Sequence, residues 1–430
     1  MKNRISISVL IYFLFQNFAY KGLAQLIIDA QFRTRFELRD GYQKLAKPDA
    51  ISAEIITQRT RLNLNYETEK LRFKFSIQDV RVWGDDTNVS FSGSTGNYAS
   101  IDLYEGYADL KLGTSGWLTL GRQQLVYDNQ SILGNANWNQ NGIASDAAVL
   151  KLKKDGWNLH LAGSWNSLTQ LQSGNTYDTI RYKSLNFLWL NRKFSDDFSF
   201  SVIHVSAGVM DSNTGHSINF SQTSGTYFTY NARDFDLWAN AYYQFGKNRK
   251  GISKSAFMMD AEINYKFGKL TPAFGFSYLS GNNKTDTGVS VDNLFEGIYR
   301  ARHNYFGFID YFTIYDSQTN SGGLVDYYLY FEYKFSKSVR LTNTSHYFQL
   351  AQTNPSTPAD KNLGYENDLI LKYKFNDWGA LEFGYMFFLP TESLKTIQNV
   401  PENKLSQFIY LQLTLTPTLF KQIKEKEEKL

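Results

Sequence analysis

The sequence contains no cysteine, and this absence excludes structural disulfides, thiolate metal sites and cysteine nucleophiles. It has only 7 prolines, and proline is the residue that cannot donate a hydrogen bond to a strand ladder. Beyond the N-terminal segment it lacks any apolar run long enough to span a membrane as a helix. Its formal net charge of +4 is too small to indicate a nucleic-acid partner. These shortages disfavour helical membrane proteins, disulfide scaffolds and nucleic-acid binders.

Aromatic residues are abundant instead, with 33 Phe and 29 Tyr giving most of an aromatic content of 16%. Phe and Tyr favour pleated, half-buried strand surfaces. The mean hydropathy is −0.40, far below that of a helical membrane protein. A transmembrane β-barrel tolerates such a value because only alternate residues face lipid. The composition therefore favours an all-β chain.

The N-terminus has the pattern of a signal peptide. Lys2 and Arg4 precede an apolar stretch over residues 5–18, and Gly22 and Ala24 have the small-residue spacing of a cleavage site. The alternative is an uncleaved anchor helix, but the apolar stretch is shorter than the ~20 residues that a span requires. We expect a signal peptide at 1–24, an outer-membrane β-barrel at 25–420 and a charged C-terminal tail at 421–430.

Period-2 alternation recurs from residue 29 to the end of the chain. In the segment 29–39, DAQFRTRFELR, one face carries Phe32, Phe36 and Leu38 and the other carries arginines and Glu37. Similar segments predict one transmembrane antiparallel β-barrel of about 18 strands with long extracellular loops and short periplasmic turns. Secreted β-sandwich arrays or a propeller are the soluble alternatives, but no repeat of fixed spacing is visible.

Gly, Asn, Ser and Thr clusters mark the connections. We expect long loops around 88–97, 129–145, 170–179, 210–226, 282–304 and 352–363. We expect tight turns at 153–157 and 376–380. The first strand starts a few residues after the predicted cleavage site, which leaves no room for the plug of an energised transporter.

Arginines dominate the polar faces of the early strands. The members of this set are Arg33, Arg35, Arg39, Arg59, Arg61, Arg72 and Arg81, the last after an expected bulge near Asp79. On the lipid face each would cost ~2–4 kcal/mol, so we expect all of them to face the lumen. They would attract anionic solutes, or pair with lumen acids such as Glu37, Asp79 and Glu105, or do both.

The segment 117–150 carries a more specific pattern. Gly121-Arg122-Gln123 is followed by Tyr127, by Ile-Leu-Gly at 132–134, by Trp138 among amides, and by Asp146 at the start of the next strand. With the Arg-Thr-Arg triplets at 33–35 and 59–61 and DVRVWG at 79–84, the chain resembles the alginate export family. The resemblance implies a monomeric barrel that passes an anionic polyuronate, with Arg122 joining the electropositive pathway. Trp138, Asn139 and Asp146 are then expected at the mouth.

The expected function is passive passage of an anionic, polyuronate- or oligosaccharide-like solute through an Arg-lined lumen. No catalytic residue, metal site or cofactor is predicted, because the 5 histidines lie outside hydrolase and metalloprotease motifs. An outer-membrane surface enzyme, a loop-plugged structural or adhesion barrel and a loop calcium site remain alternatives. Expected partners are outer-membrane lipids, the solute and periplasmic proteins, in the outer membrane of a Gram-negative cell.

Overall fold

The computed structural model describes residues 24–85, 101–212, 214–284, 290–301, 303 and 305–422. The predicted loop at 88–97, nearly all of the predicted signal peptide and most of the predicted tail lie outside these residues. The strands are β1 (Gln25–Asp40), β2 (Ala53–Glu67), β3 (Leu71–Val82), β4 (Ile101–Leu112), β5 (Gly116–Gln123), β6 (Ser145–Lys154), β7 (Trp157–Trp165), β8 (Ser184–Lys193), β9 (Phe198–Met210), β10 (Ile218–Ala232), β11 (Phe235–Lys247), β12 (Ser253–Tyr265), β13 (Leu270–Leu279), β14 (Val291–Asp292), β15 (Leu324–Lys334), β16 (Val339–Gln349), β17 (Asn362–Asn376), β18 (Gly379–Pro390), β19 (Ser406–Leu415) and β20 (Thr418–Lys421).

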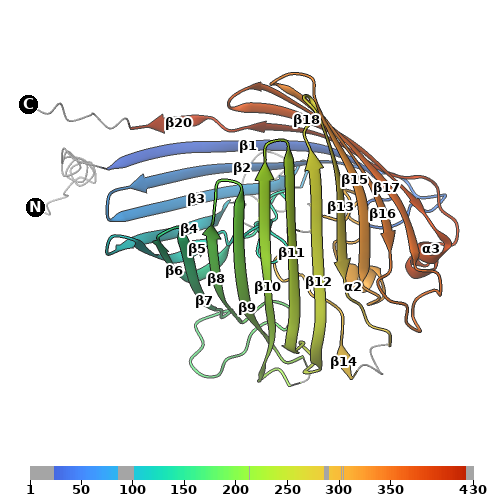
Figure 1. The fold of residues 1–430 in the computed structure, drawn as a ribbon, viewed down its shortest axis with the longest axis horizontal. Helices are drawn as coiled ribbons and strands as arrows, with labels where there is room; N and C mark the ends of the chain where they lie inside the picture. The colour runs from blue at the N-terminus through green and yellow to red at the C-terminus, as the bar shows by residue number, and fades with distance from the viewer. Residues whose placement is uncertain are drawn as a thin grey trace, which may run out of the picture.

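The strands form one closed antiparallel barrel (Figure 1). Each long strand pairs with its neighbour along the chain, and β1 closes the ring by pairing with both β2 and β19. The ring contains 18 strands, because the two-residue β14 only pairs in parallel with the edge of β12, and β20 continues β19 along β1. The predicted fold and strand number are confirmed.

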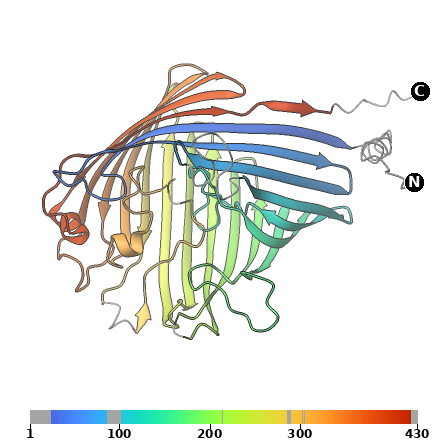
Figure 2. The same ribbon diagram turned by 180° about the vertical axis from the view of Figure 1, so that it is seen from behind.

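Connections of very different length lie at the two ends of the barrel. Tight turns such as 155–156 and 377–378 join strands at the end where β1 begins, and long loops join them at the other end (Figures 1 and 2). The loop expected over 210–226 is shorter than predicted, since β9 ends at Met210 and β10 begins at Ile218. The inner face of β10 carries Asn219, Ser221 and Thr223, residue types that are common in loops, and this composition led to the expectation of a longer loop.

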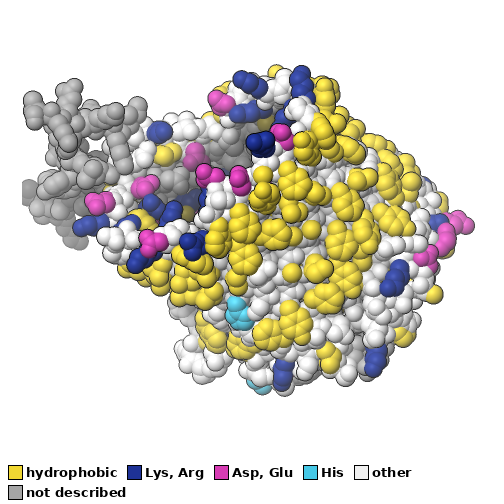
Figure 3. Space-filling view, viewed as in Figure 1, with side chains coloured by type: hydrophobic (Ala, Val, Ile, Leu, Met, Phe, Trp, Pro, Cys, Tyr) yellow, Lys and Arg dark blue, Asp and Glu magenta, His cyan; other side chains and the backbone are white. Residues whose placement is uncertain are grey.

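The outer face of the barrel carries a broad apolar band, with charged side chains gathered toward its edges (Figure 3). On β15, Leu329 and Phe331 are 49% and 42% exposed. The alternate residues Asp326 and Glu332 of the same strand are buried on the inner face. This alternation matches the lipid-facing band and polar interior of an outer-membrane barrel. No helix among the described residues is long and apolar enough to cross a membrane.

Glycines on the inner wall lie opposite tyrosines. The register pairs Gly225 with Tyr242, Gly275 with Tyr328, and Gly384 with Tyr410. In each pair the ring lies where a Cβ of the glycine would be, with Tyr328 Cζ only 1.9 Å from the Cβ position of Gly275. The missing side chain therefore lets a large ring lie flat against the wall, as in the aromatic rescue of strand glycines.

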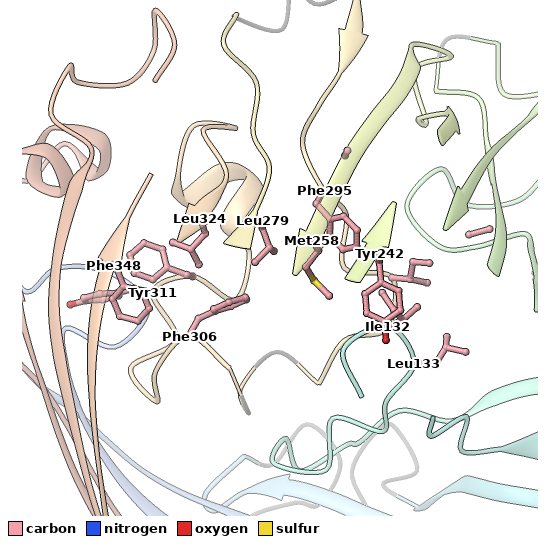
Figure 4. Packing of buried hydrophobic residues seen from close by; sticks show 14 of the residues in the cluster. Ile132, Leu133, Tyr242, Met258, Leu279, Phe295, Phe306, Tyr311, Leu324 and Phe348 are labelled. Carbon is pink, nitrogen blue, oxygen red and sulfur yellow. The ribbon is translucent and has the colours of Figure 1, made fainter. Parts of the chain in front are cut away.

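Several long loops fold into the barrel and pack there. Ile132 and Leu133 of the 124–144 loop, with Phe295, Phe306 and Tyr311 of the 280–323 loop, join one buried cluster with wall residues (Figure 4). The short helix α2 (Tyr315–Gln318) belongs to the 280–323 loop, and α3 (Glu392–Gln398) buries Leu394 above β17 and β18. The loops therefore narrow the lumen at the long-loop end.

Candidate functional site: a constriction built by two inward loops

Four arginines on the inner face of β1 and β2 hold the 124–144 loop. Arg33 pairs across the strands with Arg59, and Arg35 and Arg61 flank this pair on the same face. Their guanidinium groups donate to the backbone carbonyl oxygens of residues 137–141, one after another. The distances from Arg33 to the oxygens of residues 137, 138 and 139 are 2.7, 3.0 and 2.9 Å. The loop main chain is thus fixed by the wall.

The positive charge of this group is largely uncompensated. Arg35 forms an ion pair with Glu37 at 2.6 Å, and Arg39 contacts the same carboxylate at 2.5 Å. In the part of the chain that the structure describes, Arg33, Arg59 and Arg61 have no carboxylate within 4.0 Å. All three are at most 7% exposed. Their charges therefore act on a solute in the lumen through the electrostatic field rather than through direct contact.

The 280–323 loop is held by β17, three strands from β1 around the ring, with the reverse chemistry. Glu366 and Asp368 on β17 are buried carboxylates that accept hydrogen bonds from the backbone N–H groups of Ile309, at 2.8 Å, and Phe308, at 3.2 Å. The preceding Gly307 has φ +80, and a Cβ there would be 2.4 Å from the Glu366 carboxyl group. Only glycine lets the backbone approach this closely. Arginine donors hold one loop, and carboxylate acceptors hold the other.

Trp138 joins the two loops. The Arg35 guanidinium lies 4.0 Å from its ring centroid, and the His303 ring stacks on it at 4.1 Å with an interplanar angle of 8°. Two groups cannot share one ring face at these distances, so the indole lies between them. His303 Nδ1 is 2.7 Å from Asp310, which also accepts a short hydrogen bond from Tyr42. A single aromatic side chain thus connects β1 to both loops.

Two cavities border the 124–144 loop. One of about 310 Å³ lies between the loops and is lined by Trp138, Asn139, Tyr299, His303 and Asp310 among others. Burial raises the pKa of Tyr299 to about 12. A second cavity of about 510 Å³ lies between the same loop and the wall of β4 to β8. Burial raises the pKa of Asp128 there, while hydrogen bonds from Ser201 and Trp189 lower it.

The remaining predicted arginines divide between the two faces. Arg39 and Arg72 share the inner face with Glu37 and Glu67, to which they are ion-paired. Arg81 does not face the lumen. The pairing of β2 with β3 is uninterrupted and places Arg81 opposite Gln58. Gln58 in turn pairs with Thr34, which faces outward, so all three residues share the outer face. The bulge expected near Asp79 lies instead on β4, opposite Ser76 and Ile77.

Arg122 is also on the outer face. It pairs with Gly106, and Gly106 pairs with the lipid-facing Phe75. Its guanidinium bonds Asp146 at 3.0 Å, and both side chains are well exposed. Asp146 lies in β6, whereas Trp138 and Asn139 lie at the constriction. The expectation that Arg122 lines the pathway is therefore corrected. Arg122 and Asp146 form a polar pair on the outside of the barrel, near its long-loop end.

The second loop and its anchors were not predicted from the sequence. Glu366 and Asp368 alternate with Asn367 in the motif E-N-D, which indicates only that two carboxylates share one face of a strand. Nothing local identifies Ile309 and Phe308 as their partners. Among the described residues, no group of three or more His, Cys, Asp or Glu side chains could hold a metal ion.

Comparison with solved structures supports the barrel fold. The OpdK structure with vanillate from Pseudomonas aeruginosa is 11% identical, covers 92% of this chain and 100% of that chain, and gives a TM-score of 0.59. OpdO of the same organism gives 0.62 at 13% identity, with 92% and 98% covered. A BenF-like porin from Pseudomonas fluorescens gives 0.58 at 12% identity, with 92% and 99% covered.

These similarities establish a porin-like barrel fold, and together with the family match below they place it in the Gram-negative outer membrane. A comparison with curated proteins finds no match. The sequence profile described as alginate export matches residues 24–406, which is most of the chain and includes the whole constriction. The chain therefore belongs to the alginate export family.

Proposed function

We propose that this protein is a passive channel whose lumen favours an anionic solute of the polyuronate or oligosaccharide type. The observation that carries the proposal is the group of Arg33, Arg59 and Arg61, buried beside the constriction without a carboxylate partner among the described residues. Charges with low exposure are screened less by salt than exposed charges. A cluster of one sign at the narrowest part of a pore selects ions of the other sign.

The comparisons support the same solute class. The family is described by alginate export, and alginate is a polyuronate. OpdK was solved with vanillate, a small carboxylate. We further propose that residues 1–24 are removed on export and that one copy of residues 25–420 forms the channel.

The test is the reversal potential of the refolded protein in a planar bilayer across a KCl gradient. The native protein should prefer chloride. Arg59→Gln should lower this preference, whereas Arg59→Lys, which keeps the charge, should retain most of it. Arg122→Gln removes the same charge from the outer face and is the matched control. A native channel without anion preference, or an equal effect of both Gln variants, would contradict the proposal.

The second candidate is a barrel closed by its loops. It is favoured by the apolar cluster that the 124–144 and 280–323 loops form inside the lumen. Absence of any conductance from protein with a native strand content would support this closed barrel and overturn the open channel. The similar solved structures, which include porins, do not favour the third candidate, a surface enzyme.

A further inference from the structure

A row of basic and aromatic side chains crosses the inner wall from β4 to β8. The register pairs Lys111 with Trp117, Trp117 with Lys151, Lys151 with His160, and His160 with Trp189. Cross-strand partners share one face of a sheet. This face is the inner one, because the same parity includes Thr119 and Val149, both 0% exposed. All five side chains are half-buried and so border the lumen.

The two lysines of this row make little contact with carboxylates. The Lys111 ammonium lies 4.6 Å from the Trp117 ring centroid, and Arg72, from the adjacent β3, lies 4.1 Å from it. Within the described residues, Lys111 has no carboxylate within 4.0 Å. Lys151 has only a loose contact of 4.0 Å with Asp109, and its side chain is 34% exposed. Neither ammonium group therefore has a close carboxylate partner among the described residues.

The row starts near the tight-turn end and leads to the second cavity. Lys111 is next to the last residue of β4, whereas Trp189 lies in the middle of β8. The cavity of about 510 Å³ is lined by Lys151, His160 and Trp189 from the row. Val126 and the carboxyl, amide and phenol groups of six further residues complete the lining: Glu105, Tyr107, Gln123, Gln124, Tyr127 and Asp128. Aromatic surface with a few polar groups is typical of a ligand site.

The spacing of the row selects an extended ligand. Neighbouring strands are about 4.8 Å apart, so Lys111 to Lys151 and Lys151 to Trp189 are each about 10 Å along the wall. A small aromatic carboxylate carries one anionic group and can reach only one lysine. A chain of uronate sugars repeats a carboxylate and a ring with apolar C–H faces along its length. Carboxylates suit the ammonium groups, and sugar C–H faces suit the indole rings.

We propose that Lys111, Trp117, Lys151, His160 and Trp189 form a binding track for a linear oligouronate on its way through the lumen. The inference rests on the proposed function and adds the binding groups and the minimum ligand length. The arginines of β1 and β2 provide a positive electrostatic potential at the constriction. The track provides contact on the wall of β4 to β8.

The test uses single-channel current in a planar bilayer with a hexameric uronate added on the side of the tight turns. Binding in the track should interrupt the current. Trp189→Leu should shorten each interruption about tenfold, a loss of about 1.4 kcal/mol. It should leave the KCl reversal potential unchanged, since no charge is removed. Trp157→Leu, on the lipid-facing side of β7, is the matched control and should change neither quantity.

The charged part of the track is tested by Lys111→Gln combined with Lys151→Gln. This variant should also shorten the interruptions, whereas Lys154→Gln, on the outer face of β6, should not. Monomeric glucuronate and a neutral hexasaccharide should interrupt the current far less. An anion-selective channel that the hexauronate does not block, or a Trp189→Leu variant with native interruptions, would overturn the track alone. A channel without anion preference would overturn the proposed function instead.

Discussion

Tyr328 shows how a single residue on the inner wall depends on its cross-strand neighbour. Its ring lies over Gly275, and its hydroxyl donates to Glu262 at 2.9 Å. The carboxylate of Glu262 faces inward with few other partners, so this hydrogen bond satisfies a group that is costly to leave unpaired in a low-dielectric interior. Because Gly275 has no side chain, the Tyr328 ring can lie where its hydroxyl reaches the Glu262 carboxylate.

We expect Gly275→Ala to destabilise the barrel by about 1–3 kcal/mol, because the new methyl group would overlap the Tyr328 ring. The measurement is urea unfolding of the protein in lipid vesicles, followed by tryptophan fluorescence. Gly163→Ala on β7 is the control, since the nearest atom to its Cβ position is the end of the Asn186 side chain at 3.2 Å. Equal destabilisation by both variants would show that overlap with the Tyr328 ring does not set the cost.

Alternation along one strand was enough to place some side chains but not others. Arg33 and Arg59 lie within long regular alternations, so their inward direction followed from the sequence. Arg81 was placed wrongly because Val80 and Val82 suggested a shift of face, and apolar side chains near the loops do not have to face lipid. Arg122 was placed by family resemblance, whereas its direction depends on the pairing of β4 with β5.

The two inward loops are elements whose positions depend on the walls. The 124–144 loop contributes carbonyl oxygens to arginines, and the 280–323 loop contributes N–H groups to carboxylates. The loops meet at Trp138, between Arg35 and His303. The size of the opening therefore depends on a contact between loops as well as on the anchoring of each loop.

We expect Trp138→Ala to increase the single-channel conductance and its fluctuation, because it removes the group that holds the two loops together. Trp138→Phe keeps an aromatic ring between Arg35 and His303 and should remain close to the native conductance. Both are measured in planar bilayers at high salt, where charge effects are screened. A Trp138→Ala channel with native conductance and low noise would contradict this role of the indole.

The conformation of these loops could not have been predicted from periodicity. Arg33 and the carbonyl of residue 137 are 104 positions apart, and Ile309 and Glu366 are 57 apart. Gly, Asn and Ser clusters indicate that a loop exists but not whether it folds inward. One pairing in the row from Lys111 to Trp189 follows from a predicted feature. The tight turn expected at 153–157 sets Lys151 opposite His160.

The whole molecule is a closed sheet with an apolar outside and a polar inside. The apolar band in Figure 3 would face the acyl chains, and the loops fill part of the interior. This arrangement followed from composition and alternation, because low hydropathy, abundant Tyr and Phe and few prolines fit few other folds. The closure between β1 and β19 also follows, since a spanning sheet cannot leave an unpaired edge in lipid.

We expect Leu329→Arg, at the centre of β15 on the outer face, to cost ~2–4 kcal/mol of stability in a bilayer. Thr344→Arg lies on the neighbouring strand but faces the lumen, opposite Asp368, and should cost much less. Urea titrations of vesicle-folded protein give both values. A smaller loss for Leu329→Arg than for Thr344→Arg would be incompatible with the orientation of the wall.

The contact between the arginines and the 124–144 loop has a consequence for redesign of the pore. Arg33, Arg35, Arg59 and Arg61 bind main-chain oxygens, which every amino acid possesses. The side chains of Asn137 and Asn139 are exposed and take no part in this anchoring. New side chains can therefore be introduced at these two positions while the loop stays in place, so the barrel is a scaffold whose selectivity can be changed without rebuilding its constriction.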